Sequence, residues 1–493
     1  MSWRTQLAFT PLDTGARGAE VGRRLRYAIE LGILEDGARL PSESELAVQM
    51  GVSTNTVREG LSELRRWGLL ETRRGRGGGS FVRANRELMT EAQRATLAEY
   101  SVMELRDMRE FRAFLAGSAA AAAAQRSPAL SLQRLSSLGA AIRTMSTTAD
   151  AARADSRFHL ELAAASQSVR LTQAELAMQA EVGPLIWMHT ADSAHAAGHA
   201  ADQHLAVVDA IGKGSVELAR TLAEEHVRHD MNRLIDLRMS ASSKQGARPS
   251  TGVGGEAAIT EVMALGGRVL AAATESIEQV ETAVLAAIGD SAQGDVAALA
   301  PLYDVTHTAL RDHLPWIRTV GFTSNPEFFG VAELIACSAP AGSESIRMSS
   351  ADWTGYDFST AVWWPHGIPD NLINATGAFV DASGSNEYIV AFSKAVLRGS
   401  VMLGVASADC PVEDLQSLFE PVLVQLPRGT CVFDQNGIVI ATNTASLIGG
   451  SLGSSGYFGN FLDLPGVPWK LRVADPSRLT AESKKRPRVG SMR

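Results

Sequence analysis

The sequence of 493 residues predicts a multidomain protein with three parts of different fold class. The first, at residues 17–85, is a small helical domain ending in a β-hairpin, because two short amphipathic segments precede a glycine- and arginine-rich turn. The second, at 98–238, is an all-α bundle, because it is rich in alanine and leucine without strand patterns. The third, at 256–476, is an α+β domain, because β-type stretches separated by turns follow a long amphipathic segment.

The N-terminal part contains the motif "LPSESELAVQMGVSTNTVREGLSELRRWG". Ser42 and Glu45 have the spacing of a capping box, and Gly51 suits the left-handed position that ends a helix. Ser53 is placed to cap a second helix. Two helices joined by so tight a turn predict a helix-turn-helix.

The second helix of this motif begins with side chains that bind phosphates and base edges, namely Thr54, Asn55, Thr56 and Arg58. The following "LLETRRGRGGGSFV" predicts a hairpin with a basic tip, as in a DNA-binding wing. Residues 17–83 carry 12 arginines and 9 acidic residues, whereas the whole chain has net charge −8. An ordinary helical hairpin with a solvated arginine loop is the alternative, but a further predicted helix at Val21–Leu31 favours the DNA-binding domain.

"ARLPSESELAVQMGVSTNTVREGLSELRRWGLLETRRGRGGGSFV" resembles the winged helix-turn-helix of the GntR family of bacterial regulators. The chain departs from many members at Ser44 and Thr54, where they have arginine, so we expect an unusual operator. The residues expected to contact DNA are Arg39, Ser53, Thr54, Asn55, Thr56, Arg58, Arg74, Arg76 and Gly77.

The middle part concentrates histidines, with seven of the ten lying between His159 and His229. Asp155 and His159 are four residues apart, so on a helix they share one face and can bind one ion. His204 and His226 lie on two further predicted helices. Other histidines compete for the same role or are solvated surface residues: His189, His195, His199 and His229. His195 and His199 lie in a glycine- and alanine-rich stretch that is a candidate loop.

This part resembles the FCD ligand-binding domain of the FadR-type GntR subfamily. The resemblance implies a divalent cation held by Asp155, His159, His204 and His226. Three nitrogen ligands and one oxygen suit Zn²⁺, with Ni²⁺ and Mn²⁺ as alternatives. "MELRDMREF" resembles the first helix of the domain, and Arg106 is expected to bind a carboxylate effector. A metal-dependent hydrolase fused to a DNA-binding module is the alternative function, although the sequence offers no clear general base.

In the C-terminal part, a helix is predicted at Glu256–Ile288, with Ile259, Met263, Leu270, Ile277, Val284 and Ile288 on one face. The later stretches resemble a Cache (PAS-like) sensor domain, in "YDFSTAVWW", "TGAFVDASG", "GVASADCPVEDL" and "FDQNGIVIATN". The resemblance implies a ligand pocket formed by Tyr356, Trp363, Trp364, Asp381 and Asp409.

Amino-acid-binding Cache domains carry an arginine where this chain has Ala361, so we expect an amine-containing or neutral ligand. The alternatives are that the tryptophans are core residues, that Asp409 caps a helix beginning near Pro411–Glu413, and that the domain only oligomerises.

The chain shows no signal peptide and no uninterrupted apolar run of membrane-spanning length. Its three cysteines, Cys337, Cys410 and Cys431, are widely spaced and form no metal or redox motif, as expected in a reducing cytoplasm. We therefore expect a cytoplasmic, homodimeric transcriptional repressor without enzymatic activity. Its partners would be operator DNA, an organic acid in the middle domain and an unidentified metabolite in the C-terminal domain.

Overall fold

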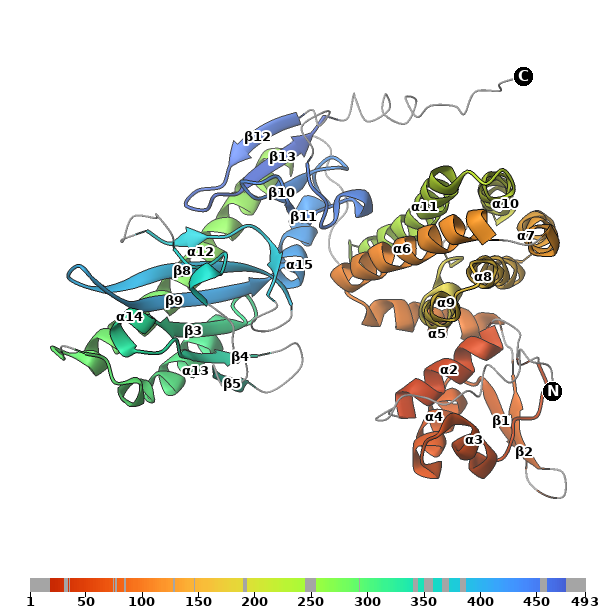
Figure 1. Ribbon diagram of the computed structural model, residues 1–493, viewed down its shortest axis with the longest axis horizontal. Helices are drawn as coiled ribbons and strands as arrows, with labels where there is room; N and C mark the ends of the chain where they lie inside the picture. The colour runs from red at the N-terminus through yellow and green to blue at the C-terminus, as the bar shows by residue number, and fades with distance from the viewer. Residues whose placement is uncertain are drawn as a thin grey trace. The chain divides into compact units, whose positions relative to one another are not determined.

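The structure is a computed structural model that describes residues 18–475, except 31–33, 35, 74, 76–77, 84–85, 127–128, 146, 189–192, 244–253, 292, 340–344, 350–357, 366–371, 382–386 and 453–458. It divides into two compact units, Met1–Arg238 and Met239–Arg493 (Figure 1). The stretch Ser240–Gly255, whose serine, glycine and proline content is typical of a linker, lies largely outside the described residues.

The first unit begins with a winged helix-turn-helix, as predicted. Its elements are α2 (Gly18–Glu30), α3 (Glu43–Met50), α4 (Thr54–Arg66), β1 (Leu70–Arg73) and β2 (Gly79–Val82) (Figure 1). The Ser42/Glu45 capping box is present, and Gly51 ends α3 with φ 68°. Ser53 caps α4 by accepting a hydrogen bond from the Thr56 amide at 3.1 Å.

Packing in this domain places α4 close against α2. The apolar side chains of the helix pair are buried together with Val21, Leu25 and Ile29 of α2: Leu46, Ala47 and Met50 of α3, and Val57, Leu61 and Leu64 of α4. Gly60 faces α2 so closely that a Cβ atom there would lie 2.7 Å from the Gly18 carbonyl oxygen. Burial of the apolar face of α4 leaves its polar N-terminal face exposed to solvent.

The remainder of the first unit is all-α. Its helices are α5 (Arg86–Glu99), α6 (Val102–Arg126), α7 (Ala129–Ala141), α8 (Thr148–Ala165), α9 (Val169–Glu181), α10 (Ser193–Gly212) and α11 (Val216–Ser243). The stretch with His195 and His199, a candidate loop by composition, belongs to helix α10. The alanines Ala197, Ala200 and Ala201 explain this, because they give α10 a buried face with little bulk.

The second unit combines helices with two antiparallel sheets. The larger sheet has the order β5-β4-β3-β9-β8-β6, with β7 also paired to β8, and the smaller has the order β11-β10-β13-β12. The strands of the larger sheet are β3 (Thr319–Ser324), β4 (Leu334–Ser338), β5 (Ile346–Ser349), β6 (Asn374–Ala375), β7 (Phe379–Val380), β8 (Tyr388–Arg398) and β9 (Val401–Pro411). Those of the smaller sheet are β10 (Cys431–Phe433), β11 (Val439–Thr442), β12 (Gly459–Asp463) and β13 (Lys470–Ala474). The helices are α12 (Gly254–Ile288), α13 (Leu302–His313), α14 (Pro326–Phe329) and α15 (Val412–Leu423).

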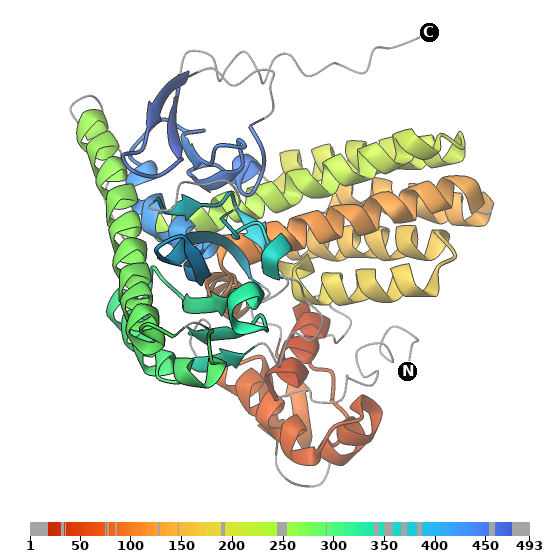
Figure 2. The same ribbon diagram turned by 60° about the vertical axis from the view of Figure 1, so that its left-hand side comes forward.

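Helix α12 runs beside both sheets (Figure 2). Near its C-terminal end Glu281 pairs with Lys394 of β8 at 2.6 Å, and nearer its N-terminus Gly266 lies against Leu464, after β12. The predicted apolar face is correct for Ile277, Val284 and Ile288, which are buried. It is wrong for Ile259, Met263 and Leu270, which are only half-buried, because the face toward the sheets runs instead through Ala258, Val262, Leu265 and Val269.

By length and composition α12 also qualifies as a membrane-spanning helix, at mean hydropathy 1.3. The core helix of a soluble protein meets the same criterion. Its regularly spaced buried residues and its glutamates agree with such a core helix.

Candidate metal centre and ligand-binding surfaces

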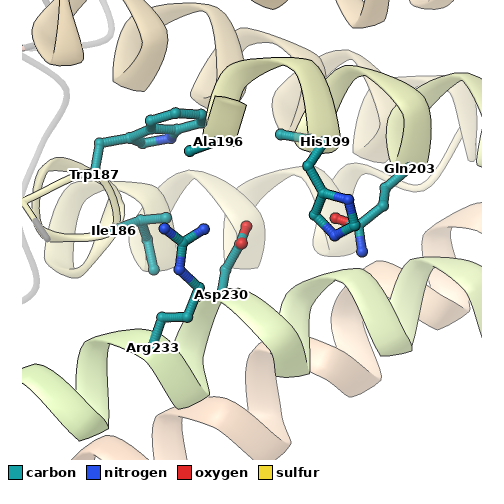
Figure 3. A pocket seen from close by; sticks show the side chains of 8 residues that line it. Ile186, Trp187, Ala196, His199, Gln203, Asp230 and Arg233 are labelled. Carbon is teal, nitrogen blue, oxygen red and sulfur yellow. The ribbon is translucent and has the colours of Figure 1, made fainter. Parts of the chain in front are cut away.

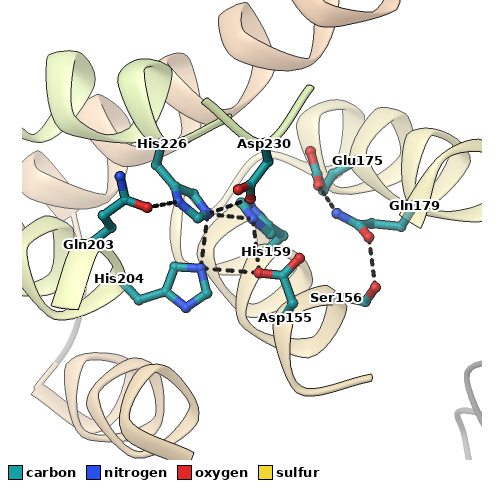
Figure 4. A network of polar contacts seen from close by, with 9 residues as sticks. All are labelled: Asp155, Ser156, His159, Glu175, Gln179, Gln203, His204, His226 and Asp230. Carbon is teal, nitrogen blue, oxygen red and sulfur yellow. Dashed lines mark hydrogen bonds and ion pairs between the residues drawn. The ribbon is translucent and has the colours of Figure 1, made fainter. Parts of the chain in front are cut away.

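Four of the predicted side chains meet inside the bundle (Figure 4). Asp155 and His159 come from α8, His204 from α10 and His226 from α11, and one ligand atom of each lies within 4.8 Å of the others. The Nε2 atom of His226 is 3.0 Å from that of His204 and 3.3 Å from that of His159. The Oδ1 atom of Asp155 is 3.3 Å from Nε2 of His204 and 3.8 Å from Nε2 of His159.

The cluster is buried, and its electrostatics favour the protonation states in which histidine and aspartate bind a metal ion. Burial lowers the pKa of His159 to about 3, despite the opposing effect of Asp155. Burial, His204 and His159 also hold the pKa of His226 well below its ordinary value. Burial disfavours the Asp155 carboxylate, but His159 and His204 outweigh this and lower its pKa. Two of the imidazoles are thus neutral and the carboxylate is ionised, which are the states that coordinate cations.

The spacing of the ligand atoms also suits an ion. Ligands about 2.0–2.1 Å from a tetrahedral ion lie roughly 3.3–3.4 Å from one another, which is close to the four separations above. The Asp155 Oδ1 atom is buried and accepts no hydrogen bond of normal geometry from a described residue. His226 Nδ1 lies 3.0 Å from Gln203 Oε1, so this nitrogen donates a proton and Nε2 keeps its lone pair for the cluster.

A small cavity lies beside the cluster, between α10, α11 and the residues that follow α9 (Figure 3). Its lining residues are Ile186, Trp187, Ala196, His199, Ala200, Gln203, Asp230 and Arg233. Asp230 Oδ2 is 3.6 Å from Nε2 of His226, so the cavity reaches the edge of the cluster. Burial and the nearby Asp155 raise the pKa of Asp230 to about 7.

Arg112 of α6 is a residue that the sequence interpretation missed. Its side chain is fully buried, and its three guanidinium nitrogens have no hydrogen-bond partner among the described residues. Its charge contributes to the lowered pKa values of His159 and His226. Arg106, the predicted effector ligand, is only partly buried on the same helix. The sequence "MREFRAFLAG" gives little sign of this burial, because the neighbouring Phe111 and Phe114 are exposed whereas Arg112 is buried.

The predicted DNA-contacting residues that the structure describes lie at one end of α4 and beside the hairpin. Thr54, Asn55 and Arg58 are exposed, and Arg58 pairs with Glu43 at 3.1 Å. Arg39 forms a bridge with Phe81 of β2 and is also exposed. Arg74, Arg76 and Gly77 lie outside the described residues.

The C-terminal unit has a cavity where one was predicted. Trp363, Asp381 and Asp409 line it, together with Thr319, Thr323, Leu334, Ala336, Met348, Phe358, Ile389 and Ser407. Trp364 packs in the adjacent apolar core, and Tyr356 lies outside the described residues. The alternative that Asp409 caps a helix is wrong, because Pro411 is at the N-cap of α15 and no side chain caps that end.

Asp409 is half-buried and lines this cavity together with Asp381. Burial, then Asp381 and Glu387, raise the pKa of Asp409 well above its ordinary value. A cationic group in the cavity would therefore relieve an unfavourable concentration of acidic groups.

Two family models match the first unit. "Bacterial regulatory proteins, gntR family" matches residues 17–79, and "FCD domain" matches residues 107–229. The HTH-type transcriptional regulator RmpR of Mycobacterium gastri is 37% identical over 236 residues, covering 48% of this chain and 86% of the relative. A second relative is the L-lactate dehydrogenase operon regulatory protein of Escherichia coli K12, 32% identical over 227 residues, covering 42% of this chain and 82% of the relative.

Solved structures resemble each half at low identity. E. coli McbR/YncC is 18% identical, with a TM-score of 0.29, and the match covers 45% of this chain and 99% of that one. The ligand-binding domain of the Campylobacter jejuni chemoreceptor Tlp3, solved with L-norvaline, is 16% identical, with a TM-score of 0.32, covering 50% of this chain and 100% of that one.

The two family models and the two sequence relatives give no support to the metal-dependent hydrolase that the sequence left open, and regulators of this kind are not usually enzymes. The family models agree with the winged helix and the helical bundle described above. The chain belongs to the GntR family of bacterial regulatory proteins and is a DNA-binding transcriptional regulator with an FCD domain.

Proposed function

We propose that the chain is a metal-containing, non-enzymatic regulator whose affinity for operator DNA is set by small-molecule effectors. The observation that carries this proposal is the convergence of Asp155, His159, His204 and His226 from three helices inside the bundle. A buried group of three imidazoles and one carboxylate is costly to assemble unless a cation offsets the loss of solvation. When bound, the ion supplies a Lewis-acidic anchor for an anionic ligand.

The ion is Zn²⁺ in this proposal, because three nitrogen ligands and one oxygen in near-tetrahedral spacing suit it. Ni²⁺ and Mn²⁺ remain the alternatives. Gln203 orients His226, and the small neighbouring cavity beside Asp230 has space for about one water-sized ligand.

The effector of this domain is an organic acid. Arg112 is a fully buried cation without a hydrogen-bond partner in the described part of the chain, and its charge reaches the cluster. A guanidinium binds a carboxylate through two parallel hydrogen bonds. A carboxylate would thus satisfy both the ion and Arg112, and this residue replaces Arg106 as the favoured effector ligand.

The protein acts in the cytoplasm as a homodimeric repressor on a roughly palindromic operator, since a two-fold dimer presents its recognition helices to two half-sites. The DNA-contacting set is Arg39, Ser53, Thr54, Asn55, Thr56 and Arg58, with Arg74, Arg76 and Gly77 of the wing.

The C-terminal domain is a second sensor in this proposal. Its cavity combines the aromatic walls Phe358 and Trp363 with the acidic residues Asp381 and Asp409, and Ala361 stands where an arginine would bind a carboxylate. An amine-containing ligand fits this combination better than a simple acid.

The test is metal analysis of the purified full chain, followed by thermal denaturation with a panel of organic acids. We expect one divalent ion per chain, lost in His159→Ala but kept in His307→Ala, which removes an exposed histidine of α13. We also expect stabilisation by an organic acid, and its loss in Arg112→Met. Equal metal content in His159→Ala and wild type would contradict the assigned ligands.

A further inference from the structure

The winged helix-turn-helix places an acidic residue beside an arginine of the DNA-contacting set. Glu43 is the first residue of α3, and the capping box of Ser42 and Glu45 fixes the start of this helix. Arg58 lies on the second turn of α4 and is exposed. Because α3 and α4 pack on one core, these side chains, 15 residues apart in the sequence, meet on the surface.

The carboxylate of Glu43 contacts one edge of the Arg58 guanidinium group. Its Oε2 atom accepts a hydrogen bond from Nε of Arg58 at 3.2 Å and lies 3.1 Å from Nη2. A guanidinium group carries one N–H on Nε and two on each terminal nitrogen. Glu43 therefore takes the edge formed by Nε and Nη2. It leaves two parallel N–H groups, one on each terminal nitrogen, to bind a ligand.

Glu43 also joins this arginine to the wing. Its Oε1 atom lies 3.8 Å from Nη2 of Arg65, and that nitrogen donates to Oγ of Ser80 in β2 at 3.3 Å. The side chains of Arg58 and Glu43 are 58% and 33% exposed, so their ion pair adds little to the stability of the free protein. The pair instead holds a long side chain in one conformation before DNA arrives, which lowers the entropic cost of binding.

The sign of its charge makes Glu43 informative. A negative charge beside phosphates weakens binding to any DNA, whereas a fixed arginine favours only DNA that offers the right acceptors. In the major groove, guanine offers the adjacent acceptors O6 and N7, which an arginine binds through two parallel N–H groups. Adenine has the N6 amino donor in place of O6, so it cannot accept both bonds.

We propose that Glu43 is a specificity-determining residue of the operator-binding surface, which positions Arg58 to read a guanine. The inference rests on the role of Arg58 in DNA recognition proposed above. Glu43 acts through Arg58 and contacts no base itself. Replacement of Glu43 should therefore change the choice between DNA sequences, and should not reduce the affinity for DNA in general.

The test uses mobility-shift titrations of the full chain carrying Glu43→Met, which keeps the length of the side chain and removes its oxygens. The DNA is an operator that wild type selects from random duplexes, copies of it with each G·C pair replaced in turn by A·T, and an unrelated duplex. We expect Glu43→Met to lose on the order of tenfold discrimination at one base pair of the half-site. Its affinity for the unrelated duplex should be equal to or above that of wild type, which also shows that the variant is folded.

Two further variants make the result specific. Glu63→Met removes an equal charge from the side of α4 that faces α2, and it should discriminate as wild type does. Arg58→Met should lose discrimination at the same base pair as Glu43→Met. The double variant should lose no more than Arg58→Met alone, because the two residues act as one unit.

Full discrimination in Glu43→Met, with a loss in Arg58→Met, overturns the inference and leaves recognition by Arg58 intact. An equal loss of affinity for every duplex would place the arginine on phosphate oxygens, which also contradicts a role in specificity. If Arg58→Met keeps both affinity and discrimination, the proposed recognition surface fails, and the role of Glu43 fails with it.

Discussion

At the residue scale, the polar side chains of the first unit form two groups, one buried inside the bundle and one exposed on α4. Asp155 and the three clustered histidines are inside the bundle, where a polar group requires a partner, whereas Arg58 and Asn55 are exposed on α4, where a partner can arrive from solution. Spacing in the sequence was enough to find the Asp155/His159 pair, because residues four apart share a helix face. It was not enough to find Arg112, because a charged residue in an alanine-rich helix gives no sign of being buried.

Replacement of Arg58 tests the DNA-contacting face. Arg58→Ala should weaken operator binding by about 1–3 kcal/mol if the guanidinium contacts a base. The control is Arg66→Ala, which removes an exposed arginine at the opposite end of the same helix. Mobility-shift titrations measure the affinity of both variants for DNA that wild type selects from random duplexes. Equal affinities for wild type and Arg58→Ala would remove this residue from the recognition surface.

The acidic cavity of the C-terminal unit predicts a pH effect. Burial, Asp381 and Glu387 raise the pKa of Asp409, so the folded state holds this proton to a higher pH than the unfolded state, whose pKa is about 3.9. The contribution of Asp409 to stability is therefore full at acid pH and is lost as pH rises toward the folded-state pKa. Asp409→Asn should raise the melting temperature more at pH 8 than at pH 5.

The control for this effect is Asp463→Asn, since the side chain of Asp463 is 83% exposed and belongs to another sheet. It should show little dependence on pH. If the melting temperatures of wild type and Asp409→Asn differ by the same amount at pH 5 and pH 8, the raised pKa of Asp409 is contradicted.

At the element scale, helices were predicted well where capping residues and periodicity agreed. Ser42, Gly51 and Ser53 mark the ends of α3 and α4 because their effects are local. The sequence does not decide whether the segment with His195 and His199 is helical, because its glycine has low helix propensity. The helix forms because its alanines pack inside the bundle. The buried face of α12 was misplaced for the same reason: a helix rich in apolar residues on several faces does not reveal which face meets the sheets.

A pair of matched substitutions tests the orientation of α12. Ile277 is fully buried against the sheets and Ile259 is only half-buried. Ile277→Ala should cost about 2–5 kcal/mol of unfolding free energy, and Ile259→Ala clearly less. Denaturant unfolding of both variants gives the comparison. Equal losses would contradict the observed face, and a chain that requires detergent to stay in solution would favour a membrane role for this helix.

At the scale of the whole molecule, the first unit contains both the DNA-binding surface and the proposed effector site, and contacts connect them. Arg23 of α2 lies 3.8 Å from Glu181 at the end of α9, and the Gln93 side chain donates to the Pro184 carbonyl oxygen at 3.1 Å. Ile186 and Trp187 follow directly and line the cavity beside the metal cluster. A ligand that moves this short segment would alter the support of the winged helix. We expect these contacts to be the route by which binding in the FCD domain changes the position of the DNA-binding domain.

Effector control of DNA binding is tested most directly by the affinity of the full chain for its operator. This affinity is measured with and without the organic acid that stabilises the protein, in metal-loaded wild type and in Arg112→Met. Coupling between two sites typically amounts to about 1–3 kcal/mol. We expect the acid to change the operator affinity of wild type by roughly 5- to 150-fold, and Arg112→Met to bind the same DNA without responding to the acid. An operator affinity that is unchanged by the acid in wild type, or that responds equally in Arg112→Met, would contradict effector control through Arg112.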